Sequence, residues 1–151
     1  MIEFGQDAPR LGNQYLEDTA LNLYLNYLLP SENTHGKELA AFGAKVASAE
    51  YLSHSREAER NKPWLEQFDA YGNRIDKIHT SESWKFFKRE SARNGLISTP
   101  YNSDMSNKPN ETERLIQITK LHLFAASSAM FSCPLAMTDG AATVIRNILR
   151  G

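Results

Sequence analysis

A run of 18 residues, from Leu121 to Thr138, contains no Asp, Glu, Lys or Arg. So long an uncharged segment has to leave water, either in a bilayer or inside a folded domain. A membrane-spanning helix needs about 20 predominantly apolar residues, whereas this run contains His122, three serines and Pro134. We therefore expect two buried helices that meet at a bend around residues 132–134, and no membrane span.

The composition is that of an ordinary globular domain. The chain has 151 residues, of which 41% are hydrophobic and 23% charged, enough for one domain with its own core. Its formal net charge of −1 disfavours a dedicated nucleic-acid binder, whose affinity depends on neutralising phosphates. Cys133 is the single cysteine, which excludes an intrachain disulfide framework and a metal cage built on thiolates.

The amino terminus has neither the basic nor the apolar segment that a secretory signal carries. We therefore expect an intracellular protein, with the cytoplasm favoured and a mitochondrial location left open.

In the first third of the chain we expect an irregular arm over residues 1–15 and then two helices. Asp18 is the expected N-cap of a helix over about 19–29, whose apolar residues lie nearly all round it and predict burial on both sides or a partner surface. A continuous helix is expected over residues 36–58, because apolar and small residues recur there at spacings of three and four: Leu39, Phe42, Val46, Ala49 and Ser53.

The middle of the chain contains a β signal. Segments 64–68 and 74–78 flank the turn-forming sequence Asp-Ala-Tyr-Gly-Asn at 69–73. This arrangement predicts a small hairpin, which has to pack on the helices because an isolated hairpin is only marginally stable.

A helix is expected over residues 82–93, with Thr80 or Ser81 as its N-cap and Gly95 just past its end. Its central segment, Trp-Lys-Phe-Phe-Lys-Arg at 84–89, combines aromatic and basic residues, as some nucleic-acid-binding surfaces do. The aromatic and the basic residues fall on different faces, however, which favours an ordinary amphipathic helix.

The last third predicts a loop and two helices. Residues 98–110 are rich in Ser, Asn and Pro, which predicts a flexible loop. Asn110 has the spacing of a capping residue for a helix that ends near Phe131. Pro134 is tolerated in the first turn of a final helix, which carries Leu135, Ala142, Ile145 and Leu149 on one face. The expected fold is an all-α domain of about five helices with one small β-hairpin.

Candidate catalytic and metal-binding residues are few. Glu50, His54 and Glu57 lie on one face of the expected helix over 36–58, but a carboxylate-bridged metal site needs a second ligand set on a facing helix. The sequence offers no such set, so we interpret the three as a solvated charged face. Cys133 is expected to be a small buried side chain and not a nucleophile, and no glycine-rich phosphate-binding loop is present. We therefore predict no catalytic and no metal-binding residue.

The two apolar helices within residues 115–149 offer more hydrophobic surface than the other helices of so small a domain can cover. They are rich in Ala, Ser, Met and Thr, which suits an acyl or flavin surface, or an interface with a further domain. Simple core packing explains the same pattern, and both interpretations stay open.

Two motifs resemble those of the AidB-like branch of the acyl-CoA dehydrogenases. Residues 133–138, Cys-Pro-Leu-Ala-Met-Thr, followed by Ala-Ala-Thr at 141–143, are similar to a Cys-Pro-x-x-Met-Thr-x-Ala-Ala stretch near the end of that branch's N-terminal helical domain. Residues 68–76, Phe-Asp-Ala-Tyr-Gly-Asn-Arg-Ile-Asp, are similar to its Tyr-Asp-Ala-x-Gly-x-Arg-x-Asp turn, and Trp84 follows at the matching distance. The chain departs from the branch at 81–84, Ser-Glu-Ser-Trp, where His-Pro-x-Trp is common.

This resemblance implies that residues 16–151 form the N-terminal helical domain of an AidB-like acyl-CoA dehydrogenase, as a fragment or a truncated product, with the loop at 98–110 as an insertion. In that family a glutamate removes the α-proton of an acyl-CoA while a hydride passes to FAD. A middle β-domain and a C-terminal helical domain hold most of the flavin, and the C-terminal domain carries the glutamate. The resemblance therefore implies that this chain holds no FAD and has no catalytic residue of its own. It further implies that Met137 and Thr138 face the acyl pocket and that the complete protein is a homo-oligomer.

A second hypothesis stays open, in which the chain is a stand-alone interaction module without enzymatic activity. A link to nucleic acid is suggested by the association of the AidB-like branch with the response to alkylation damage. The contacting residues would be basic residues of the helix over 82–93, namely Lys85, Lys88, Arg89 and Arg93. The nearly neutral charge of the chain weighs against it.

Overall fold

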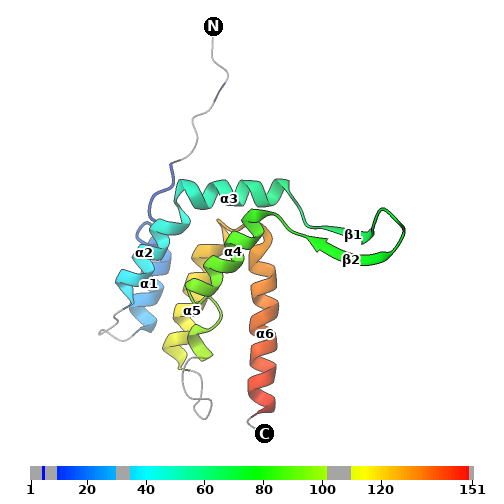
Figure 1. Ribbon diagram of the computed structural model, residues 1–151. Helices are drawn as coiled ribbons and strands as arrows, with labels where there is room; N and C mark the ends of the chain where they lie inside the picture. The colour runs from blue at the N-terminus through cyan, green and yellow to red at the C-terminus, as the bar shows by residue number, and fades with distance from the viewer. Residues whose placement is uncertain (1–4, 6–9, 30–34, 102–109, 150–151) are drawn as a thin grey trace.

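The computed structural model describes residues 5, 10–29, 35–101 and 110–149. It contains six α-helices and one antiparallel hairpin of two strands (Figure 1). The elements are α1 Thr19–Leu28, α2 Gly36–Val46, α3 Ala49–Arg60, β1 Trp64–Phe68, β2 Arg74–His79, α4 Glu82–Arg93, the 3₁₀ turn η1 Thr99–Tyr101, α5 Glu111–Ala125, the 3₁₀ turn η2 Ala129–Phe131, and α6 Ser132–Ile148. The expected all-α class with one hairpin is confirmed, with six helices in place of about five.

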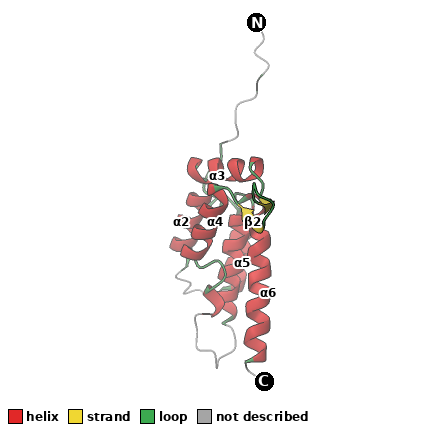
Figure 2. Cartoon of the chain, turned by 45° about the vertical axis from the view of Figure 1, so that its right-hand side comes forward, coloured by secondary structure: helices red, strands yellow, loops and turns green. Residues whose placement is uncertain are grey.

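The helices form two groups that α3 joins. Helices α4, α5 and α6 run along a common direction (Figure 2), and α3 lies across one end of them (Figure 1). The hairpin projects from that same end, beyond α6, whereas α1 and α2 lie at the opposite side of the domain (Figure 1). The outer faces of α1 and α6 therefore point to opposite sides.

Aromatic rings form the centre of the core. The Tyr51 ring of α3 meets the Phe87 ring of α4 at a centroid distance of 5.7 Å, and Phe87 meets Phe124 of α5 at 5.8 Å. Phe131 of η2 lies 6.5 Å from Phe124. Most of these contacts are edge-to-face, the geometry that ring quadrupoles prefer, so one cluster holds three helices and η2 together.

The continuous helix expected over 36–58 is wrong, because the chain breaks between α2 and α3. Ser48 adopts an extended conformation, and its hydroxyl accepts a hydrogen bond from the Tyr51 backbone N–H at 3.3 Å. This N-cap starts a new helix with a new phase. Tyr51 and Ala58 are therefore buried, while the expected stripe residues Ala49 and Ser53 are exposed.

The boundary between the last two helices also differs from the expectation. Asn110 caps α5 as predicted, since its side chain accepts from the Thr112 backbone N–H at 3.0 Å. However, α5 ends at Ala125 and not near Phe131. The bend occupies residues 126–131, ahead of the expected 132–134, and includes Ala129 at a φ of 50°.

The uncharged run is only partly buried. In α5 the apolar side chains Ile116, Leu123 and Phe124 are buried, as expected. In α6 the buried residues are Leu135 and Arg146, so the expectation of a second buried helix is wrong. No helix within the described part of the chain is long and apolar enough to cross a membrane.

The hairpin and α4 have the predicted boundaries within a residue. The expectation that the hairpin packs on the helices is wrong, because among the described elements its strands contact only each other and are largely exposed. The strands pair Leu65 with Ile78, and a bulge opposite Gln67 accompanies a positive φ of 45° at Asp76. Ser81 caps α4 by accepting from the Trp84 backbone N–H at 3.2 Å. Gly95 follows the helix at a φ of 62°, the left-handed conformation that favours glycine. Of the expected loop, Thr99–Tyr101 is a 3₁₀ turn, and 102–109 lie outside the described residues, as does most of the amino-terminal arm.

Candidate functional site

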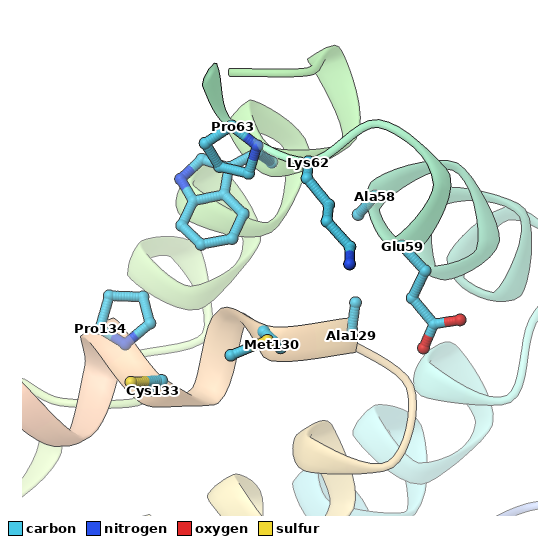
Figure 3. A pocket seen from close by; sticks show the side chains of 9 residues that line it. Ala58, Glu59, Lys62, Pro63, Ala129, Met130, Cys133 and Pro134 are labelled. Carbon is cyan, nitrogen blue, oxygen red and sulfur yellow. The ribbon is translucent and has the colours of Figure 1, made fainter. Parts of the chain in front are cut away.

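Two hollows flank the first half of α6. The first, which we call the Trp84 pocket, has a volume of about 540 Å³ and lies between the end of α3, α4, η2 and the start of α6. Its walls are mainly apolar, and include Pro63, Trp84, Met130 and Pro134. The Lys62 side chain extends over the pocket toward Ala129 and Met130 (Figure 3). Lys62 and Glu59 therefore bring one charge of each sign to an otherwise apolar pocket (Figure 3).

The second hollow, which we call the Thr138 groove, has a volume of about 490 Å³. It lies between α6 and the segment that runs from the end of α4 to η1. Nine residues line it, and none of them is charged: Ser91, Ala92, Gly95, Ile97, Ser98, Tyr101, Leu135, Thr138 and Ala142. The groove therefore presents hydrocarbon with a few neutral hydroxyl groups.

A polar network meets the Thr138 groove at Tyr101 and fixes α6 to α5. Arg114 donates two hydrogen bonds to the carboxylate of Asp139, at 2.8 and 2.7 Å. The Tyr101 hydroxyl donates to the same carboxylate at 2.8 Å and lies 2.9 Å from the Thr143 hydroxyl. Burial opposes ionisation of Asp139, but the hydrogen bonds from Arg114 and Tyr101 prevail and hold its pKa below the ordinary 3.8. The network stays charged at neutral pH and fixes the position of Tyr101 in the groove wall.

The two residues predicted to face the acyl pocket lie next to each other on α6, with different surroundings. Thr138 lines the Thr138 groove, and its hydroxyl donates to the Pro134 carbonyl at 2.8 Å. Met137 lines neither hollow and is 72% exposed. Their role at the acyl pocket stays a prediction.

Cys133 is not the buried side chain that was expected. It is exposed, at the rim of the Trp84 pocket. The reason is the position of the bend, because α6 begins at Ser132 and Leu135 faces the core, which leaves Cys133 on the opposite side of the first turn.

Of the expected charged face, Glu50 is exposed, whereas His54 and Glu57 are partly buried. His54 Nδ1 lies 2.8 Å from the Ser83 hydroxyl, and its ring stacks on Phe86. Glu57 accepts from the Ser83 backbone N–H at 3.2 Å, and its hydrogen bonds with Ser83 lower its pKa. The pair thus joins α3 to the start of α4. No group of three His, Cys, Asp or Glu side chains among the described residues is placed to hold a metal ion.

The amphipathic interpretation of α4 is confirmed. Phe87 and Ser91 are buried, while the basic residues Lys85, Lys88, Arg89 and Arg93 are exposed. Two of these four are already in ion pairs: Lys85 with Glu82 at 2.6 Å, and Arg93 with Glu90 at 3.2 Å. These acidic neighbours reduce the positive potential that a nucleic-acid surface needs.

Sequence reasoning missed the Arg114–Asp139–Tyr101 network and both hollows. The three network residues are separated by at least 13 positions in the chain, and periodicity carries no signal for such contacts. The one available hint was Asp139, an acidic residue that directly follows the long uncharged run, because a carboxylate on a packed helix needs a partner.

Comparison with known proteins gives the family. Residues 7–149 match the model described as the adaptive response protein AidB N-terminal domain. The chain belongs to this family. The resemblance found in the two motifs is therefore confirmed, and the match covers almost the whole chain.

Relatives of this AidB N-terminal domain are acyl-CoA dehydrogenases. Acyl-CoA dehydrogenase family member 11 of Caenorhabditis elegans is 36% identical over 148 residues, which is 96% of this chain and 23% of that protein. The chain also matches the crystal structure of Caenorhabditis elegans ACDH-11 in complex with C11-CoA, with a TM-score of 0.84 and 36% identity. This match covers 95% of the chain and 24% of the ACDH-11 chain.

The chain matches the apo form of Bd2924 with a TM-score of 0.80 and 38% identity. This match covers 93% of the chain and 27% of the Bd2924 chain. The chain thus spans about a quarter of the length of these relatives. It is an N-terminal domain of the acyl-CoA dehydrogenase type.

Proposed function

We propose that this domain forms one wall of the acyl and flavin pocket of an FAD-dependent acyl-CoA dehydrogenase, and that it contributes no catalytic residue. The observation that carries this proposal is the outer face of α6. Its apolar side chains are largely exposed, at 72% for Met137, 57% for both Val144 and Ile145, 71% for Ile148 and 65% for Leu149. A helix with so much apolar surface exposed needs further protein or a ligand to cover it.

The chemistry of the Thr138 groove supports an acyl chain as the ligand. Its lining is uncharged, which suits hydrocarbon and not the diphosphate groups of CoA or FAD, since these require cations or clustered N–H donors. The residues of this groove therefore fit the acyl tail of a ligand, or the apolar edge of a flavin. The relative ACDH-11 was crystallised with C11-CoA, which supports an acyl-CoA ligand for this family member as well.

FAD would accept the hydride of the substrate when it is bound. The described residues of this chain would contribute the apolar wall, with Thr138 and Tyr101 in the groove and Met137 beside it on α6. The Arg114–Asp139 pair would keep that wall in place, because it fixes α6 against α5 by two hydrogen bonds.

The test uses the protein purified from its native source. Its flavin content is measured first, and then the rate of acyl-CoA oxidation is compared between wild type and Thr138→Trp. The indole fills the groove, so kcat/KM for a long-chain acyl-CoA should fall about tenfold or more, equivalent to about 1.4 kcal/mol in the transition state, with flavin content unchanged.

Ala136→Trp is the matched control, because Ala136 is exposed on the same helix and lines neither hollow. It should change kcat/KM by less than about twofold. A protein without flavin would refute the FAD-dependent function. A flavoprotein in which Thr138→Trp has no larger effect than Ala136→Trp would refute the role of the groove.

A further inference from the structure

Tyr101 lies at one end of the Thr138 groove. The residues of α6 that line the groove are Leu135, Thr138 and Ala142. Tyr101 lines it as well, and its hydroxyl lies 2.9 Å from the hydroxyl of Thr143, the residue after Ala142. From this position we propose that Tyr101 is a specificity-determining residue, which stops the methyl end of the acyl chain and so limits its length. The proposal rests on the acyl-binding role proposed above for the groove.

Beyond the Tyr101 ring, the next side chain is a charged one. Arg146 follows Ala142 by one turn of α6, and its guanidinium lies 5.6 Å from the centroid of the Tyr101 ring. Arg146 is only 6% exposed and donates to the Pro100 carbonyl at 3.0 Å. An alkyl chain that passed the ring would place hydrocarbon against this buried charge, which is unfavourable. An acyl chain in the groove therefore has to end before Tyr101.

The Tyr101 ring is fixed at this position. Its hydroxyl donates to the Asp139 carboxylate at 2.8 Å, and Arg114 holds that carboxylate by two hydrogen bonds. The preceding residue, Pro100, is buried. The ring cannot swing away from the groove without breaking the hydrogen bonds of its hydroxyl to α6. A fixed ring sets a definite limit on chain length, whereas a mobile ring would accept several lengths equally.

The length of the groove along α6 sets how many carbons lie before Tyr101. Leu135 and Ala142 are seven positions apart, which corresponds to a rise of about 10 Å along the helix. An extended alkyl chain with C–C bonds of about 1.5 Å advances about 1.3 Å per carbon, so the groove holds about eight carbons. Because Tyr101 blocks one end, these are the last carbons of the chain, and the thioester lies beyond the opposite end.

The test measures kcat/KM for a series of saturated acyl-CoAs of increasing length, with the protein purified from its native source. The readout is the chain length at which kcat/KM is highest, which a uniform loss of activity does not change. Tyr101→Ala should move this optimum to chains longer by about two carbons or more, and Ala142→Phe, which adds a ring at the same end, should move it to shorter chains by a similar amount. Each methylene that gains or loses burial should change kcat/KM by about fourfold.

Ala141→Phe is the matched control, because Ala141 is exposed beside Ala142 and lines neither hollow. Its optimum should equal that of wild type. Flavin content shows whether each variant folds, and if Tyr101→Ala loses its flavin, Ala142→Phe decides. An unchanged optimum, or an equal shift in Ala141→Phe, overturns the role of Tyr101 while the proposed function stands, provided that Thr138→Trp lowers kcat/KM. If Thr138→Trp has no larger effect than Ala136→Trp, the proposed role of the groove fails and this inference fails with it.

Discussion

At the residue scale, Gly43 shows how the absence of a side chain lets two segments meet. The Gly43 carbonyl accepts from the Gln14 backbone N–H at 3.2 Å, and the Asn13 amide donates to the Ala40 carbonyl at 2.8 Å. A Cβ atom at position 43 would lie 2.6 Å from the Tyr15 backbone nitrogen. The segment before α1 can therefore pack on α2 only because residue 43 is glycine.

We predict that Gly43→Ala destabilises the domain by about 1–3 kcal/mol, because the backbone at Tyr15 has to move. Gly140→Ala in α6 is the control, since no atom lies within 4 Å of its added Cβ. There alanine should stabilise the helix by about 0.5–1 kcal/mol. Urea unfolding of both variants measures the difference, and equal effects would contradict the packing argument.

Asp139 is the other residue whose chemistry sets a local structure. We predict that Asp139→Asn lowers the free energy of unfolding by about 1–2 kcal/mol at neutral pH. The value is modest because the Arg114 side chain is 37% exposed and solvent screens its charge. Because the folded-state pKa of Asp139 lies below its ordinary value, the carboxylate stabilises the fold fully above pH 3.8 and loses this effect as the pH falls through the folded-state pKa. The two proteins should therefore converge in stability in strong acid.

The measurement is urea unfolding of wild type and Asp139→Asn at neutral pH and in acid. Asp76→Asn serves as the control, because Asp76 pairs with Arg74 at 2.6 Å on the exposed hairpin. Exposed pairs contribute little, so this variant should cost about 0.5 kcal/mol or less. If the difference in unfolding free energy between wild type and Asp139→Asn does not become smaller in acid, the charge of Asp139 is not the source of the effect.

At the element scale, the break between α2 and α3 decides which residues enter the core. The hydrophobic stripe of the sequence continues across it, but the Ser48 cap restarts the helix and rotates the buried face to Tyr51. Helix α3 can then cross the ends of α4, α5 and α6 (Figure 1). The position of the break therefore determines the position of the hairpin that follows.

We predict that Ser48→Ala destabilises the domain by about 1 kcal/mol, because the Tyr51 backbone N–H loses its acceptor. Ser53→Ala is the same change at an exposed position inside α3, where alanine should be neutral or stabilising by a few tenths of a kcal/mol. Thermal unfolding of the two variants provides the comparison. If Ser48→Ala were as stable as Ser53→Ala, the cap would not be what divides the two helices.

At the scale of the whole molecule, some apolar surfaces of the domain are buried and others are left exposed. The aromatic cluster and α5 form a dense interior, while the outer faces of α1, α6 and the hairpin remain apolar and open to solvent. We expect the folded chain to bind a dye for exposed hydrophobic surface.

The double substitution Ile145→Lys and Ile148→Lys should reduce this dye binding and change the free energy of unfolding by less than about 0.5 kcal/mol, because both side chains are already mostly in water. Leu135→Ala, on the buried side of the same helix, should instead cost about 2–5 kcal/mol. Dye fluorescence of the folded proteins and urea unfolding distinguish the two. A native wild-type chain that binds no dye would contradict the open face of α6.

What the sequence determined by itself is local. The hairpin, α4 with its Ser81 cap and the Asn110 cap of α5 follow from turn residues and capping residues a few positions apart, and the family follows from two short motifs. The α2–α3 break is also local, because it follows from the Ser48 cap, but the apolar periodicity that continues across it concealed it. The exposure of Cys133 and the outward face of α6 were decided only by the tertiary structure. They depend on contacts between distant residues, such as Arg114 with Asp139 and His54 with Ser83. Periodicity shows that a face is apolar, but whether another element covers that face depends on how the whole chain packs.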